Sequence, residues 1–201
     1  MKKLLAAAAL SLAFSGLAQA ATLTYTGTNT VTLNNFDLTA TTGLSNGTSV
    51  FHEKFAGQGL VLNGPSRLTL TYLGSEAGHT NVFRMPTPTD VFRTGVTAVG
   101  ASVQTGPVAS GVLSFSFFDL VACLGIKNGQ GNYFPINSIG VFMESATSAL
   151  VLFNDLGHDR DFDDMAVRIQ VSPVPVPAAL PLLLTGLGGL GYFARRRRAK
   201  S

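Results

Sequence analysis

Apolar and polar residues alternate with a period of two through the middle of the chain, between Ala21 and Ser172. This alternation, rich in Thr, Val, Phe and Leu, predicts β-strands, because successive side chains of a strand point to opposite faces of a sheet. The segments concerned are 22–27, 31–39, 67–73, 112–120, 139–144, 150–154 and 165–171, with Asn-Gly turn signals at 46–47, 63–64 and 128–129. No window of ten or more residues keeps a helical period. The pattern therefore predicts an all-β fold, an antiparallel β-sandwich or jelly roll.

The two ends of the chain depart from this pattern. Lys2 and Lys3 precede an apolar stretch, and Ala18-Gln19-Ala20 has the A-x-A form of a cleavage site, so residues 1–20 are predicted to be a secretory signal peptide. At the other end, the uncharged run 178–194 precedes Arg195, Arg196, Arg197 and Arg198. As a helix, this run would measure about 25 Å, close to the lower limit for a bilayer core. We expect a single transmembrane helix with its arginines in the cytoplasm and the middle of the chain outside.

The charges are divided unevenly between the ends and the middle. Seven of the fourteen Lys and Arg lie in the two terminal segments, whereas all eleven acids lie between Ala21 and Pro177. The middle part therefore carries a net charge of −4, from seven basic and eleven acidic residues. The sequence pI of 9.2 reflects the terminal signals. This distribution argues against nucleic acid as a partner.

The tail resembles a known sorting signal. Residues 174–184 read Val-Pro-Val-Pro-Ala-Ala-Leu-Pro-Leu-Leu-Leu, and a glycine-rich stretch and the four arginines follow. This arrangement is similar to the PEP-CTERM signal of Gram-negative bacteria, in its VPLPA-type variant. The common form has Glu where this chain has Val176. The resemblance implies that an exosortase, a membrane cysteine protease, recognises the motif Val174, Pro175, Val176 and Pro177 and removes or exchanges the tail. Proteins of that family reach the cell surface or an exopolysaccharide matrix.

These signals divide the chain into three parts: a signal peptide (1–20), an exported β-sandwich domain (21–172) and a sorting tail (173–201). The middle part is long enough for one domain with a substantial core, and no internal repeat splits it. The glycines at 186–191 match the dinucleotide pattern G-x-G-x-x-G, but no βαβ unit surrounds them.

An acidic segment lies between two predicted strands, at 154–165, where six of twelve residues are Asn or Asp. Asp159, Asp161 and Asp163 have the one-three-five spacing that turns carboxylates toward a hard cation, although position six lacks the EF-hand glycine. We expect a calcium site, because oxygen ligands suit calcium. Its expected ligands are Asp155, Asp159, Asp161, Asp163, Asp164 and, from a separate segment, Glu76. Alternatively, Asp163 and Asp164 cap turns and bind backbone amides, with Arg160 and Arg168 neutralising part of the charge.

A second resemblance covers roughly residues 67–171. The stretch 74–81 reads Gly-Ser-Glu-Ala-Gly-His-Thr-Asn, and the acidic segment has the form D-x-D-x-D-D-M. Together they resemble a group of exported bacterial proteins that carry this same tail, akin to the DUF4114 type of domain. The resemblance implies no particular biochemical role.

Other candidate chemistry is weaker. Cys123 is the only cysteine, which excludes an intramolecular disulfide, and its apolar neighbours predict a buried small hydrophobe. Histidines at 52, 79 and 158 lack metal-ligand spacing, so the sequence predicts no zinc site. Glu76 with Asp161 would be the carboxylate pair of a glycosidase, but the chain has no Trp for a sugar subsite.

We therefore expect a non-enzymatic exported protein of the cell surface or extracellular matrix, possessing a calcium-stabilised body. The expected partners are an exosortase, the inner membrane (transiently) and exopolysaccharide. The alternative is a carbohydrate-binding or carbohydrate-cleaving module that acts on exopolysaccharide.

Overall fold

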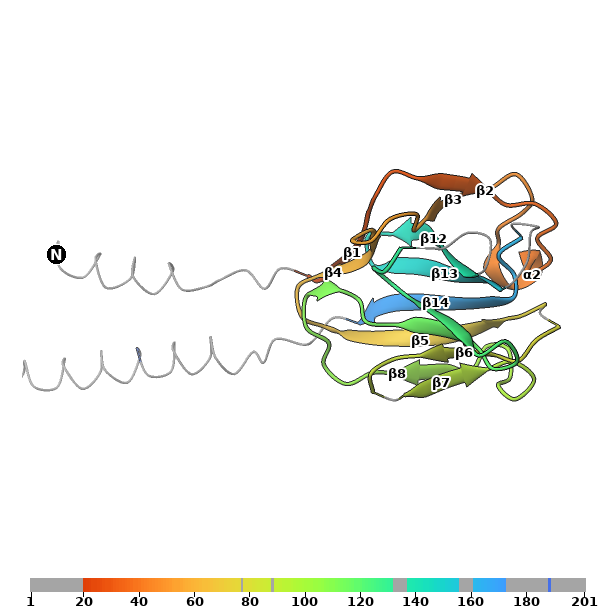
Figure 1. Ribbon diagram of the computed structural model, residues 1–201. Coiled ribbons are helices and arrows are strands. Elements are labelled where there is room, and N and C mark those ends of the chain that lie inside the picture. The colour runs from red at the N-terminus through yellow and green to blue at the C-terminus, as the bar shows by residue number, and fades with distance from the viewer. Residues whose placement is uncertain are drawn as a thin grey trace, which may run out of the picture. The chain divides into compact units, whose positions relative to one another are not determined.

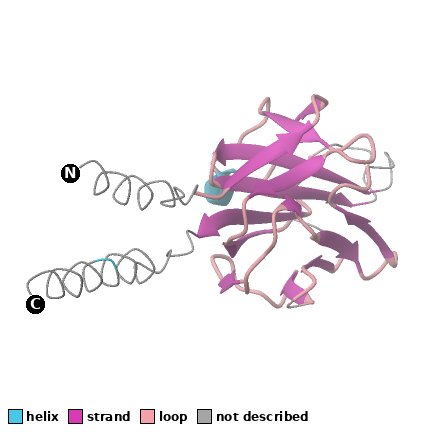
Figure 2. Cartoon of the chain, turned by 90° about the vertical axis from the view of Figure 1, so that its left-hand side faces the viewer, coloured by secondary structure: helices cyan, strands magenta, loops and turns pink. Residues whose placement is uncertain are grey.

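The computed structural model describes residues 20–76, 78–87, 89–131, 137–155 and 161–172, together with Gly188. The regular secondary structure of this part is almost entirely β-strands in antiparallel sheets, as the alternating pattern predicts (Figures 1 and 2). Residues Ala20–Pro173 form one compact unit. The predicted signal peptide, apart from Ala20, and the predicted sorting tail, apart from Gly188, lie outside the described residues. Within the described ranges, no helix combines the length and apolar character needed to cross a bilayer.

The largest sheet has seven strands in the order β2-β3-β12-β13-β14-β5-β8. Their bounds are Thr30–Thr32 (β2), Ser49–His52 (β3), Asn137–Ser145 (β12), Ser148–Asp155 (β13), Met165–Ser172 (β14), Arg67–Gly74 (β5) and Ser102–Gln104 (β8). β12, β13 and β14 pair in chain order, and β5 then adds to the outer side of β14. All eight residues of the central strand β13 are buried.

Two smaller antiparallel sheets complete the body. One has the order β1-β4-β9, with bounds Thr22–Thr26, Gly59–Asn63 and Gly111–Val112. The other has the order β11-β10-β6-β7, with bounds Leu124–Lys127, Ser116–Asp119, Asn81–Arg84 and Asp90–Arg93.

The main core joins one face of the seven-stranded sheet to both smaller sheets. Val151 and Phe153 of β13 belong to this core, together with Leu62 of β4 and Phe117 of β10. The rings of Phe117 and Phe153 are stacked, with centroids 5.0 Å apart. A four-residue helix and the loops before and after it cover the opposite face of β13. The alternating residues of β13 therefore enter two different cores, which explains why this strand reads as a continuous apolar run.

The second core contains Leu150 and Leu152 of β13, and Phe36, Leu44 and Phe162 from the covering segments. The short helix is α2 (Thr39–Thr42), and it ends at Gly43, whose φ of 75° is easily adopted only by glycine.

Two predicted strands are shorter than the alternation indicates. The segment 31–39 contributes only its first residues to β2, and the rest is a loop that buries Leu33 and Phe36 against the second core. The segment 112–120 divides between β9 and β10, because the Phe115 N–H turns back to the Leu113 carbonyl oxygen at 3.1 Å. In these segments Leu33, Phe36, Leu113, Phe115 and Phe117 are buried as expected, but without continuous sheet hydrogen bonding, and Val112 is exposed.

Candidate metal centre

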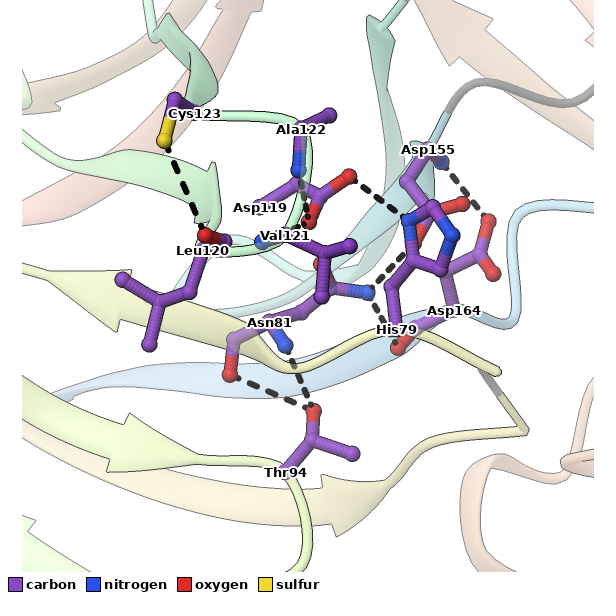
Figure 3. A network of polar contacts seen from close by, with 10 residues as sticks. All are labelled: His79, Asn81, Thr94, Asp119, Leu120, Val121, Ala122, Cys123, Asp155 and Asp164. Carbon is purple, nitrogen blue, oxygen red and sulfur yellow. Dashed lines mark hydrogen bonds and ion pairs between the residues drawn. The ribbon is translucent and has the colours of Figure 1, made fainter.

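Several polar side chains from distant parts of the sequence meet where strands of two sheets begin or end. β10 of the four-stranded sheet ends at Asp119, and its register places Asp119 opposite Asn81, the first residue of β6. β13 of the seven-stranded sheet ends at Asp155, and β14 begins just after Asp164. Asn81 Nδ2 donates a hydrogen bond of 2.7 Å to Asp155 Oδ2, so the two sheets are joined here (Figure 3).

Asp119 is the most rigidly held acid of this group. It is fully buried, and its Oδ1 accepts hydrogen bonds from the backbone N–H groups of Val121 (2.7 Å) and Ala122 (3.1 Å). These bonds form an Asx-type turn that directs the chain out of β10. The other oxygen, Oδ2, lies 2.8 Å from His79 Nδ1. Burial opposes ionisation of Asp119, but the hydrogen bonds from His79 and the two backbone amides hold its pKa below the usual range.

His79 brings a partly exposed imidazole to the buried acids. Its side chain is 35% exposed, whereas that of Asp119 is 0% exposed. The hydrogen bond and the charge of Asp119 raise the pKa of His79, and the charge of Asp155 adds to the effect. The ligand atoms of His79, Asp119 and Asp155 all lie within 4.8 Å of one another. An imidazole nitrogen and two carboxylates at such separations are a donor set that a divalent cation can use.

Asn81 lies buried behind this group. Its Nδ2 also approaches the Asp164 carbonyl oxygen at 3.4 Å, and its backbone N–H and carbonyl both bond the Thr94 hydroxyl. Asn81 is 0% exposed, and its Oδ1 has no hydrogen-bond partner among the described residues.

Two acids of the acidic segment, Asp163 and Asp164, bind backbone amides. Asp164 Oδ2 accepts the Asp155 N–H at 2.7 Å, and Asp163 Oδ2 accepts the N–H of Asp37 at 2.6 Å. This arrangement agrees with the part of the alternative in which Asp163 and Asp164 bind backbone amides, but the amide that Asp163 binds belongs to a distant segment. Arg168 does not neutralise these acids, because its guanidinium pairs with Glu144 instead. Asp159 and Arg160 lie outside the described residues.

Burial and mutual repulsion disfavour the charged forms of these acids. Burial raises the pKa of Asp164 to about 8, and the nearby Asp155, Asp161 and Asp163 contribute to the shift. Burial likewise raises the pKa of Asp163, with smaller contributions from Glu76 and Asp37.

Glu76 does come close to the acidic segment, as expected. Its backbone N–H donates to the carbonyl oxygen of Asp163 at 2.9 Å, while its side chain is exposed. The structure thus brings Glu76, Asp155, Asp161, Asp163 and Asp164 to one end of the body.

The structure also shows what sequence reasoning missed. His79 and Asp119 lie 40 residues apart, so no spacing rule could connect them, yet the fold places His79 in a group of three potential metal ligands with Asp119 and Asp155. The sequence offered only two weak signals: Asp119 ends one apolar strand, β10, and His79 lies two residues before another, β6.

The prediction for Cys123 was wrong. This residue is exposed, with a φ of 55°, in the turn that Asp119 caps between β10 and β11. Its apolar neighbours Val121 and Leu124 are exposed with it, at 63% and 40%. A hairpin turn therefore overrides the apolar pattern.

The sorting motif at Val174–Pro177, the four arginines and Ala18 of the cleavage site lie outside the described residues, and Ala20 is an exposed residue before β1. No family model matches the chain, and no curated protein or solved structure shows a significant similarity to it.

Proposed function

We propose that this chain is a non-enzymatic exported protein whose C-terminal signal delivers its β-body to the cell surface or an extracellular matrix. In this proposal the signal peptide 1–20 directs export, and an apolar helix within 178–194 holds the precursor in the inner membrane. An exosortase then cuts near Pro177. The body, 21–172, is a β-sandwich with a structural role.

One observation supports a structural role for the acidic segment, namely that its carboxylates serve the backbone of the body itself. Asp163 accepts the N–H of Asp37, and Asp164 accepts the N–H of Asp155. A glycosidase needs two carboxylates that face a substrate across a cleft. Here Asp163 and Asp164 instead connect segments of the chain through hydrogen bonds to backbone N–H groups.

One pocket lies elsewhere among the described residues. It has a volume of about 330 Å³ and is lined by Met85, Pro86, Thr87, Thr105, Gly106, Pro107, Val108 and Ser114. Because none of these side chains is ionisable, this cavity supplies no acid or base for hydrolysis. Carbohydrate binding without cleavage is the competing function, and a glycan array distinguishes the two. Saturable binding of one glycan class would support the carbohydrate-binding alternative, whereas surface retention that needs only the tail supports ours.

Calcium is the proposed stabilising ion of the acidic segment. Asp155, Asp161, Asp163, Asp164 and Glu76 bring several carboxylates to one end of the body. Burial, with a smaller contribution from repulsion between the acids, raises the pKa values of Asp163 and Asp164, and a hard cation would stabilise their charged forms. We expect calcium to raise the melting temperature and excess EGTA to lower it. Calorimetry that detects no calcium binding, with no change in melting temperature, would contradict this part of the proposal.

Intact-mass spectrometry of the native product tests the sorting step. We expect a mature form that begins after Ala20 and ends near Pro177. The matched variant replaces Pro175 and Pro177 with Ala, which removes the extended conformation that a protease groove requires. This variant should accumulate as the uncleaved precursor in the membrane fraction. A mature wild-type protein that still carries Arg195–Arg198 would refute the proposal.

A further inference from the structure

We propose that His79, Asp119 and Asp155 form a second cation site, specific for a divalent transition-metal ion of the zinc class. This site shares Asp155 with the proposed calcium site but adds an imidazole nitrogen and Asp119 as donors. It also goes beyond the sorting function. Its role would be to link the four-stranded sheet, through Asp119, to the seven-stranded sheet, through Asp155.

The separations between the donor atoms suit such an ion. Zinc binds nitrogen and carboxylate oxygen at about 2.0–2.1 Å, so tetrahedral ligand atoms lie about 3.3 Å from one another. The three donors already lie within 4.8 Å, and His79 Nδ1 is 2.8 Å from Asp119 Oδ2. The His79–Asp119 pair must open by only about 0.5 Å, and Asp155 must approach by a rotation of its side chain.

Two of the donors are held in place by neighbouring groups. The backbone amides of Val121 and Ala122 fix Asp119 through Oδ1, which directs Oδ2 toward His79. Asn81 fixes Asp155 through a hydrogen bond to Oδ2. Hydrogen bonds of this kind, which orient ligands without touching the ion, are typical of protein metal sites. The imidazole, which is one-third exposed, leaves the site an entry path and a coordination position open to water.

Asn81 provides an independent indication. Its side chain emerges beside that of Asp119, because the two residues are directly paired across β6 and β10. Its Nδ2 is turned to Asp155, and Figure 3 shows the dashed lines from this nitrogen to Asp155 and to the Asp164 carbonyl oxygen. That orientation leaves the fully buried Oδ1 without a donor among the described residues, in a group already rich in acceptors. Buried acceptors normally have a partner, and a cation satisfies several acceptors at once.

The donor set determines the class of ion. Imidazole suits zinc, copper, iron and nickel, whereas calcium and magnesium prefer oxygen ligands alone. A chain whose single cysteine rules out an internal disulfide also gains most from a metal that links two sheets. Zinc is the ion with which to test the site.

The test uses the full chain in detergent, stripped with EDTA and then titrated with Zn²⁺ against a competing chelator dye. We expect one saturable site per chain and a higher melting temperature with zinc. The His79→Gln variant should weaken zinc binding by about 100-fold or more, since loss of a ligand costs at least as much as loss of a supporting group. His79 is partly exposed, so this variant should fold. Asp119→Asn keeps an acceptor for Val121 and Ala122 and should weaken binding in the same way.

His52→Gln is the matched control, because His52 lies on β3, against Phe162, and is not in the donor set. It should bind zinc as the wild type does. Cobalt(II) substitution adds a spectroscopic readout: a visible d–d absorption in the wild type that is lost in His79→Gln. Absence of saturable zinc binding, or binding to His79→Gln as tight as to the wild type, would overturn the inference. Asp163→Asn separates the two proposals, because it should weaken the calcium response and leave zinc binding intact.

Discussion

Glu53 Oε2 accepts a hydrogen bond of 3.0 Å from the backbone N–H of Gly129, in the interior of the body. Glu53 is fully buried. Burial raises its pKa from 4.5 to about 8, and the Gly129 hydrogen bond offsets only part of this shift. Nearby Tyr25 is affected in turn, since its own burial and the charge of Glu53 raise its pKa. Glu53 is therefore protonated in the folded protein at neutral pH.

This carboxyl should make the protein less stable at alkaline pH. A carboxyl with a higher pKa in the folded than in the unfolded state takes up a proton on folding, so stability falls as pH rises from about 4.5 to about 8. The full shift corresponds to a loss of up to about 5 kcal/mol. Glu53→Gln keeps an acceptor for Gly129 but cannot ionise. Urea unfolding at pH 5 to 9 should show a clearly smaller loss for the variant.

Asp163 and Asp164 have raised pKa values as well, so some pH dependence should remain in Glu53→Gln. A matched control is Glu144→Gln, because the pKa of Glu144 is lowered rather than raised. Equal losses of stability in wild type and Glu53→Gln over this range would show that Glu53 does not titrate as we expect.

Asn128 should be among the most sensitive polar positions of the body. Its Oδ1 accepts the Leu60 N–H at 2.8 Å, and its Nδ2 donates to the carbonyl oxygens of Leu60 (2.9 Å) and Leu113 (2.7 Å). The side chain thus connects β4 at Leu60 to the segment that follows β9 at Leu113. Asn128→Ala removes these three buried hydrogen bonds, although the carbonyl oxygens of Leu60 and Leu113 keep the N–H groups of Leu113 and Phe115, so we expect a loss of about 3 kcal/mol in chemical denaturation.

Asn63→Ala is the control for Asn128, since the Asn63 amide makes exposed contacts with Thr22 and Thr24. Its cost should stay within about 0.5 kcal/mol. A similar small cost for Asn128→Ala would mean that water replaces the side chain without penalty.

The strands that could be predicted from the sequence are those with the strongest apolar signals. β13 and β14 were recognisable because they place an apolar side chain at nearly every inward position, and β14 alternates over most of its length. β6, β7 and β8 have three or four residues each, too few for a period of two to emerge. Their positions depend on pairing with distant strands, and a short segment does not encode such pairing locally.

The candidate site likewise has a part that the sequence could predict and a part that it could not. The acidic segment was recognisable because carboxylates are concentrated in it, but the partner of Asp163 is the N–H of Asp37, 126 residues away. Asp119 is a single acid at the end of an apolar strand, which is only a weak signal by itself. Its contact with His79 arises from the register of β10 against β6, which is a property of the assembled sheet.

Phe162 should anchor the acidic segment to the body. It is fully buried in the second core although Asp161 and Asp163 flank it, and its φ of 62° is unusual for a bulky residue. We expect Phe162→Ala to cost about 3–5 kcal/mol, mainly through the cavity it creates beside Leu150 and Leu152.

The anchoring role has its own readout. The Asp37 N–H donates a hydrogen bond to the Asp163 carboxylate. In Phe162→Ala, hydrogen exchange at this amide should accelerate more than exchange at the amides of β13. Phe162→Leu, which keeps more of the buried volume, is the matched control and should show a smaller effect. Uniform acceleration across β13 and the Asp37 amide would point to global destabilisation instead.

Arg168 and Glu144 should form the ion pair that contributes most to stability among the described residues. Arg168 Nη2 lies 2.8 Å from Glu144 Oε1, and Arg168 Nε lies 2.9 Å from Glu144 Oε2, so the guanidinium contacts both carboxylate oxygens in a two-pronged arrangement. The side chain of Arg168 is 27% exposed and that of Glu144 is 25% exposed. Burial of Glu144 opposes ionisation, but the hydrogen bonds from Arg168 and Ser148 outweigh it and hold its pKa below the usual range. The ion pair therefore contributes to stability at neutral pH, and this contribution is lost as pH falls through the lowered pKa of Glu144.

A double-mutant cycle with Arg168→Met and Glu144→Gln should measure a coupling energy of about 1 kcal/mol at pH 7, decreasing toward zero at acidic pH. The comparison pair is Arg84 with Asp90, where the carboxylate side is 58% exposed. Solvent screens that pair more strongly, so Asp90→Asn should cost less than about 0.5 kcal/mol. Arg168→Lys should recover less than half of the coupling, because a lysine cannot occupy both carboxylate oxygens in the planar geometry of a guanidinium. Full recovery by lysine would show that charge alone, rather than the two-pronged geometry, links β12 to β14 across β13.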